Sequence, residues 1–178
     1  MQAEEYEALA RASRKRALFQ QDPACTLDLD RSAVERLLPH RDPFLFVDHI
    51  TSADLANRTI VGCRRLDPGD PVFRGHFPGE PIYPGVLQLE TMGQVGLCLF
   101  ALLRNGRTTV RPEDRPRAVR GLKIHHAVFL EPVRAGDDLV VLAQEMESDD
   151  FTAVCAGQLY VGDTICCFSI MEVYFVDA

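Results

Sequence analysis

The order of apolar and polar residues predicts six β-strands. Each predicted strand is rich in Val, Ile, Phe and Thr, often alternates between apolar and polar positions, and is bounded by Gly, Asp or Asn. The six segments are residues 44–51, 58–66, 117–130, 138–147, 151–162 and 164–175. Asp149-Asp150 and Gly162-Asp163 are typical of hairpin turns, so the last three segments are expected to be neighbours joined by hairpins.

Three other stretches predict helices. Residues 85–103 are apolar on nearly every side, which is typical of a helix buried in a core. Residues 3–20 carry acidic residues first and basic residues last, which suits the helix dipole, and their thin apolar face is expected to pack on the domain or on a partner subunit. A short helix over 31–38 is capped by Asp30 and stopped by Pro39. Several antiparallel strands with one enclosed helix indicate an α+β fold whose sheet curls around that helix.

The length of 178 residues indicates a single domain, expected over residues 25–178, preceded by an N-terminal helical extension over residues 1–24. The first 16 residues lack the apolar core of a secretory signal, and no run of 18 uncharged apolar residues occurs, so a cytoplasmic protein without a membrane span is expected. Six cysteines without a C-x-x-C pair indicate reduced thiols, and five histidines without metal-site spacing make a metal site improbable.

The net charge of −7 argues against nucleic-acid binding, but the charge is uneven along the chain. The segment from residue 104 to residue 123 contains seven basic residues and two acidic ones. This segment is either a solvated loop or a docking surface for an acidic partner. The basic residues are Arg104, Arg107, Arg111, Arg115, Arg117, Arg120 and Lys123.

Glu90 is the anomaly of the apolar helix, because an unpaired buried carboxylate costs several kcal/mol. Three interpretations are open. Glu90 lies on an exposed edge of the helix, its carboxyl group has hydrogen-bond partners in the structure, or it has a function. Gln94 stands one turn later on the same face and is able to hold the carboxyl group. His76 lies in a turn rich in glycine and proline, and Gly85 begins the helix, where free N–H groups bind anions.

This set supplies a base near neutrality, an acid and an oxyanion site. It suits removal of a proton next to a carbonyl group, with the enolate oxygen held by backbone N–H. Nucleophilic catalysis fits less well, since no Ser or Cys follows a nucleophile-elbow pattern beside His76.

Three segments carry a resemblance to a known family: "LLPHRDPFLFVD", "PVFRGHFPGEPIYPGVLQLETMGQ" and "HHAVFLEPVRAGDDLVV". They resemble the FabZ-type (3R)-hydroxyacyl-acyl carrier protein dehydratases, collinearly over about residues 31–176. The resemblance implies a hot-dog fold and a homodimer, in some relatives a trimer of dimers, in which His76 of one subunit meets Glu90 of the other. It also implies a substrate carried on the phosphopantetheine of an acyl carrier protein, and no bound cofactor.

Within this resemblance His76 is the base, Glu90 the acid and Gly85 the oxyanion donor. Three further residues are expected near the substrate: Gln94 to orient Glu90, and Phe77 and Tyr83 to line the pocket, although simple packing is the favoured role for Tyr83. Leu89, Val95 and Phe100 are expected in the core or along an acyl channel.

Related FabA-type enzymes with isomerase activity have Asp where this chain has Glu90, so plain dehydration in fatty-acid or related acyl-chain synthesis is favoured. An acyl thioesterase and a non-catalytic carrier-binding subunit are the alternatives. Gln88, Tyr83 and Glu80 depart from the usual family pattern. These departures leave open the acyl chain length and the carrier protein, and a specialised pathway would fit them.

Overall fold

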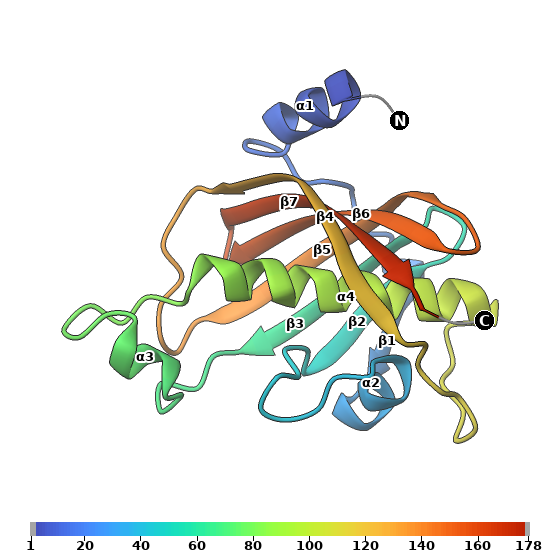
Figure 1. Cartoon of the computed structure of the whole chain (residues 1–178), viewed down its shortest axis with the longest axis horizontal. Helices are drawn as coiled ribbons and strands as arrows, with labels where there is room; N and C mark the ends of the chain where they lie inside the picture. The colour runs from blue at the N-terminus through green and yellow to red at the C-terminus, as the bar shows by residue number, and fades with distance from the viewer. Residues whose placement is uncertain (1–2, 177–178) are drawn as a thin grey trace.

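A seven-stranded antiparallel sheet and one long helix packed across it form the centre of the computed structural model, which describes residues 3–176 (Figure 1). The strand order is β1-β2-β3-β5-β6-β7-β4, so β4 lies at one edge. The strands are β1 (Thr26–Leu29), β2 (His49–Asp54), β3 (Thr59–Arg65), β4 (Val119–Phe129), β5 (Asp138–Ser148), β6 (Thr152–Val161) and β7 (Thr164–Phe175). The helices are α1 (Ala3–Ala12), α2 (Arg31–Leu37), α3 (Val72–Gly75) and α4 (Gly85–Asn105), with a short 3₁₀ turn η1 (Pro23–Cys25).

The central helix α4 confirms the prediction of a core helix. Met92, Val95 and Leu99 are almost inaccessible, and α4 packs against β3, β5, β6 and β7. Its length and hydropathy would suffice to cross a membrane, but 67% of its most apolar window is buried inside the protein. The helix runs two residues beyond the predicted end and stops at Gly106, whose φ of 63° is left-handed. The apolar surface of α4 is therefore used in the core.

Two glycines allow α4 to lie close to the sheet. A Cβ atom at Gly157 of β6 would stand 2.9 Å from Cβ of Met92, and one at Gly96 of α4 would stand 2.9 Å from Sγ of Cys155. Both distances are too short for real carbon contacts, so only glycine permits this helix–sheet spacing.

The hairpin predictions are confirmed. β5 and β6 join through Asp149–Phe151, and β6 and β7 join through Gly162-Asp163, with Gly162 at a φ of 57°. The predicted strand over 44–51 is wrong in its first half. Residues 44–48 follow an irregular path with Leu45, Phe46 and Val47 buried, and β2 begins at His49. Their apolar character reflects burial without strand pairing. The short strand β1 was not predicted.

The N-terminal helix is shorter than predicted, because Gln158 of β6 forms hydrogen bonds to the backbone that follows this helix. The buried Gln158 side chain donates from Nε2 to the carbonyl groups of Ser13 (2.6 Å) and Arg16 (2.8 Å), and its Oε1 accepts from the N–H of Leu18 (2.7 Å). These bonds require a turn where the sequence alone predicts further helix. α1 therefore ends at Ala12.

The helix α1 packs on the face of the sheet opposite α4. Its Tyr6 and Ala10 side chains are buried against Val154, Phe168 and Ile170. The predicted short helix is confirmed as α2, with the Asp30 carboxylate accepting from the N–H of Ala33 at 2.9 Å. The division between an extension over 1–24 and a domain over 25–178 stays a prediction.

Candidate active site

His76 is held in a closed turn that leads into α4. Its N–H donates to the carbonyl of Val72 (3.0 Å), and its carbonyl accepts from the N–H of Ile82 (2.9 Å). Inside this loop, the N–H groups of Phe77 and Glu80 donate to each other's carbonyl at 3.0 Å. Gly79 takes a φ of 83°, which other residues rarely adopt. The glycine-rich and proline-rich sequence therefore fixes the backbone that carries His76.

The ring of His76 has a defined tautomer. Its Nδ1 lies 2.9 Å from the carbonyl oxygen of Ile82, and a carbonyl oxygen only accepts hydrogen bonds, so Nδ1 carries the proton. In the neutral imidazole the Nε2 atom is then unprotonated and available as a base. The predicted base is thus oriented by the same residue, Ile82, that closes its turn.

A cavity of about 530 Å³ joins His76 to the start of α4. Gly85 is the first residue of the helix, so its N–H group has no acceptor within the helix. The ring of Phe129 packs against Gly85, and a Cβ atom there would lie 2.7 Å from its Cε1. The cavity is therefore lined by both His76 and Gly85, opposite a wall formed by Phe129, Leu130 and Pro132, and their roles as base and backbone donor stay a prediction.

Glu90 is half-buried, and its carboxyl group has hydrogen-bond partners. It lines a different cavity, of about 590 Å³. The Nε2 atom of Gln94 donates to Oε1 of Glu90 at 2.8 Å and to the carbonyl of Phe44 at 2.9 Å. The Oε1 atom of Gln94 accepts from the N–H of Phe46 at 2.7 Å. Gln94, which is fully buried, thereby fixes the carboxyl group and ties the irregular 44–46 segment to α4.

His40 is a residue near Glu90 that sequence reasoning missed. Its Nε2 atom lies 3.5 Å from Oε1 of Glu90. Burial lowers the pKa of His40, an effect that outweighs the attraction of Glu90. The contact is therefore between a neutral imidazole and the carboxyl group rather than a full ion pair. The signal was the "PHRDPF" segment, which carries the family resemblance and places this histidine directly before the segment that Gln94 binds.

The structure does not bring His76 and Glu90 together within one chain. His76 lines the cavity at the start of α4, Glu90 lines the other, and Val86 is the residue common to both linings. The Val86 side chain is 70% exposed between them. A site containing both groups therefore needs another surface at this face.

The same face exposes apolar side chains and an unpaired sheet edge. Among the described strands, β4 pairs with β7 and has its other edge open. Leu122, Ile124 and Phe129 on this strand are each more than half exposed. An open edge with apolar side chains is typical of a surface that pairs with another chain.

The two remaining predicted residues differ in accessibility. Phe77 is 51% exposed and its ring stacks on His76 with centroids 4.0 Å apart, so it is placed to meet a ligand. Tyr83 is 1% exposed and packs between Phe73 and the guanidinium of Arg64, with its hydroxyl 3.5 Å from Oγ1 of Thr91. Packing is thus the visible role of Tyr83, although its backbone turn also borders the His76 cavity.

Comparison with known proteins identifies the family of this chain. Residues 38–169 match the FabA-like domain family. The chain is 34% identical over 149 residues to the 3-hydroxyacyl-[acyl-carrier-protein] dehydratase FabZ of Campylobacter concisus, covering 84% of this chain and 99% of that protein. It is 44% identical over 112 residues to FabZ of Chlamydia trachomatis, covering 62% of this chain and 69% of that protein.

Solved structures support the fold alone, because their sequence identities are low. The dehydratase heterocomplex ApeI:P from Xenorhabdus doucetiae has a TM-score of 0.63 at 15% identity, covering 81% of this chain and 91% of that chain. A hypothetical thioesterase from Streptococcus pneumoniae has a TM-score of 0.50 at 9% identity, covering 67% and 80%. The predicted hot-dog fold is confirmed by these neighbours together with the family match. The chain therefore belongs to the FabA-like domain family and, within it, to the FabZ-type 3-hydroxyacyl-[acyl-carrier-protein] dehydratases.

Proposed function

We propose that this chain removes water from (3R)-3-hydroxyacyl thioesters held on an acyl carrier protein and releases trans-2-enoyl thioesters. Membership of the FabZ-type dehydratases makes it a hydro-lyase. The observation that carries the proposal is the orientation of His76: its Nδ1 faces the carbonyl oxygen of Ile82, which leaves Nε2 as the candidate base in a cavity that also contains the N–H groups that begin α4. Fatty-acid or related acyl-chain synthesis in the cytoplasm is the setting that this reaction fits.

Each complete site forms across a homodimer, with His76 from one subunit and Glu90 from the other. Two observations support this arrangement: the two side chains line separate cavities of one chain, and the open β4 edge lies beside both linings. Pairing of two such edges would cover the exposed apolar residues of β4. Further assembly of dimers into a trimer is not needed to complete a site.

The reaction proceeds by moving one proton and one hydroxyl group. Nε2 of His76 takes a proton from the α-carbon, and the electron pair forms an enolate whose oxygen accepts a hydrogen bond from the N–H of Gly85. The enolate then restores the carbonyl group and forms the α–β double bond. The β-hydroxyl leaves with the proton of the Glu90 carboxyl group, as water. The proton on His76 returns to Glu90, directly or through solvent, and the site is reset.

Gln94 and His40 act as positioning residues for Glu90. Gln94 has no freedom to turn, because its amide also bonds the backbone of Phe44 and Phe46. The acid is therefore held at a fixed place on the wall of its cavity. Phe77 is positioned to contact the thioester next to His76.

The basic segment after α4 supplies the docking surface for the acidic carrier protein. Arg111, Arg115, Arg120 and Lys123 are exposed, whereas Arg107 is paired with Asp114 and stabilises the loop itself. The docking surface therefore includes fewer basic residues than the seven predicted from the sequence. Because the carrier protein delivers the substrate on its own phosphopantetheine, the enzyme needs no cofactor of its own.

The decisive assay follows two products at once. The purified chain is incubated with a 3-hydroxyacyl thioester, and enoyl absorbance and free thiol are both recorded. Dehydration gives enoyl product without thiol, whereas a thioesterase releases thiol. A carrier-binding subunit without activity gives neither signal and would refute the proposal.

A further inference from the structure

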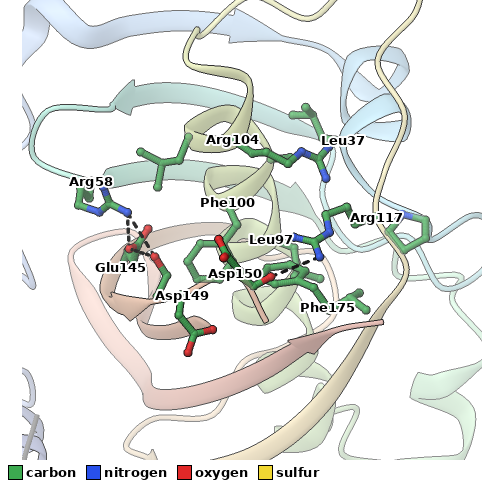
Figure 2. Close-up of a pocket in the computed structure, with 15 residues that line it drawn as sticks. Leu37, Arg58, Leu97, Phe100, Arg104, Arg117, Glu145, Asp149, Asp150 and Phe175 are labelled. Atoms are coloured by element: carbon green, nitrogen blue, oxygen red, sulfur yellow. Dashed lines mark hydrogen bonds and ion pairs between the residues drawn. The ribbon is translucent and has the colours of Figure 1, made fainter. Parts of the chain in front are cut away.

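A third cavity lies beyond Glu90, toward the C-terminal end of α4. It measures about 320 Å³ and is drawn in Figure 2. Leu97 of α4 and Val119 of β4 line both this cavity and the one that contains Glu90. The two spaces are therefore adjacent along one side of α4. We call the cavity of Figure 2 the distal chamber.

The wall of the distal chamber nearest α4 is apolar. Leu97, Phe100 and Ala101 come from the helix, and Phe175 of β7 meets Phe100 edge-on with ring centroids 6.1 Å apart. Such a wall suits the methylene groups of an acyl chain that passes Glu90 and follows the helix.

The opposite wall is built around a buried carboxylate. The side chain of Glu145 is only 4% exposed, and it is paired with the guanidinium of Arg58. The hydroxyl of Ser148 donates to the same carboxylate at 2.6 Å. Figure 2 shows Arg58 and Glu145 side by side at the chamber. A buried charged group on the wall of an acyl-binding cavity is costly unless it has a partner or a purpose.

The backbone around Arg58 is shaped to hold this pair. Arg58 has a φ of 56°, which is unusual for a residue other than glycine, and its carbonyl accepts from the N–H of Glu145 at 3.0 Å. Arg58 ends the hairpin turn between β2 and β3, which accounts for this conformation. The pair therefore has a fixed position at the chamber.

Charged groups of both signs line the chamber. Arg58, Arg104 and Arg117 line it together with Glu145 and Asp150, whereas the Asp149 carboxylate accepts from the N–H groups of Phe151 and Thr152 in its own turn. The guanidinium of Arg117 lies 4.6 Å from the ring centroid of Phe175 and donates to the carbonyl of Asp150 at 3.5 Å. The chamber thus offers both hydrogen-bond donors and hydrogen-bond acceptors. It suits a neutral group that donates and accepts hydrogen bonds, because the buried Glu145 carboxylate would repel an anionic chain end.

The length of the route is set by the helix. Ten residues separate Glu90 from Phe100, which is about 15 Å at the rise of an α-helix. An extended hydrocarbon advances about 1.3 Å per carbon, so roughly a dozen carbons reach the chamber from the reacting β-carbon.

We infer that the preferred substrates carry a neutral polar group, such as a hydroxyl, at the far end of a long acyl chain, where it binds in the distal chamber at the Arg58–Glu145 pair. This inference rests on the proposed dehydration. A plain methyl terminus of the same length would make no hydrogen bond to this wall.

The test compares matched thioesters on the dehydration assay. 3-Hydroxytetradecanoyl and 3,14-dihydroxytetradecanoyl pantetheine thioesters differ only at the far end, and a 3-hydroxyhexanoyl and 3,6-dihydroxyhexanoyl pair is too short to reach the chamber. We expect kcat/KM to favour the dihydroxy substrate about tenfold in the long pair, the effect of one hydrogen bond to a charged group, and not in the short pair. Equal values in the long pair, or preference for a carboxylate terminus of the same length, would overturn the inference. Absence of dehydration with every substrate would instead refute the proposed function.

A double variant tests whether the preference for the dihydroxy substrate arises at the Arg58–Glu145 pair. Arg58→Leu with Glu145→Leu removes both charged partners together, so that the buried Glu145 carboxylate is not left without its partner. We expect the long-pair preference to disappear or reverse. The matched control is Arg65→Leu with Asp138→Leu, which removes an ion pair at the other end of the same two strands, where the side chains are 62% and 71% exposed. The control should keep the tenfold preference. If both double variants keep it, the chamber does not bind the chain terminus.

Discussion

The Nε2 atom of Gln94 donates a hydrogen bond of 2.8 Å to Oε1 of Glu90, one turn earlier on α4. The same amide binds the backbone of Phe44 and Phe46, so Glu90, the proposed acid, and the segment before β2 share one fixed side chain. The position of the carboxyl group is therefore decided by tertiary contacts as well as by the helix.

Replacing Gln94 with Leu should lower kcat and stability together. The substitution frees Glu90 and leaves buried backbone groups unpaired, each costing about 1–3 kcal/mol. We expect kcat of the folded protein to fall about 10- to 100-fold, with a lower midpoint in urea. Gln158→Leu is the matched control, since Gln158 is equally buried and bonds backbone groups on the other face of the sheet. A control that loses kcat to the same degree would show that stability alone explains the effect.

The proposed division of the site between two subunits predicts complementation. His76→Ala and Glu90→Gln should each reduce turnover by about 10²- to 10⁴-fold while leaving the dimer intact. Mixed and reassembled in equal amounts, they should regain about a quarter of the wild-type activity, because half of the dimers then contain one complete site. Size-exclusion chromatography monitors assembly. A mixture as inactive as its components would place both groups in one subunit.

Gly85→Ala should lower activity by displacing the ring of Phe129. A Cβ atom at residue 85 would lie 2.7 Å from the Phe129 ring, so the ring must leave the position in which it lines the cavity that contains His76. We expect a rise in KM and a fall in kcat of about tenfold or more, as for displacement of an oxyanion donor. The double variant Gly85→Ala with Phe129→Ala makes room and should recover part of the activity. Failure of this rescue would separate the defect from the steric clash.

Salt should weaken turnover on the carrier protein more than turnover on a small thioester. In the proposed docking surface, the exposed basic residues of the basic segment after α4 would interact with an acidic carrier through charges that salt screens over about 10 Å at 0.1 M. The comparison is kcat/KM for carrier-bound and pantetheine-bound substrate across a salt series. Exposed Arg111 is the first residue to test, as Arg111→Gln. Equal salt dependence for both substrates would argue against this docking surface.

His40 should make stability depend on pH. Burial holds its pKa in the folded protein below the ordinary value of about 6.5, although Glu90 partly opposes this and Arg41 adds to it. The unfolded chain therefore binds a proton first as pH falls, so stability is full above about pH 6.5 and is lost on acidification through that value. Melting temperatures between about pH 5 and 8 should fall more steeply for the wild type than for His40→Asn. Parallel curves would mean that His40 titrates normally.

The sequence by itself determined the parts of the molecule that depend on local pattern. The apolar helix 85–103, five of the six predicted strands and both hairpin turns were predictable, because periodicity and turn residues act over a few positions. The turn around His76 was predictable for the same reason, since glycine and proline restrict the backbone wherever they stand. The family resemblance added the hot-dog fold and the chemistry.

Only the tertiary structure decided the features that join distant segments. Gln158 ended α1 early by binding a loop about 140 residues away in sequence, and burial without pairing kept residues 44–48 out of β2. Three further relationships depend on how the sheet folds around α4. They are the approach of His40 to Glu90, the separation of His76 from Glu90, and the ion pair of Arg58 with Glu145. Such contacts are set by packing over the whole chain, and no local pattern of residues contains them.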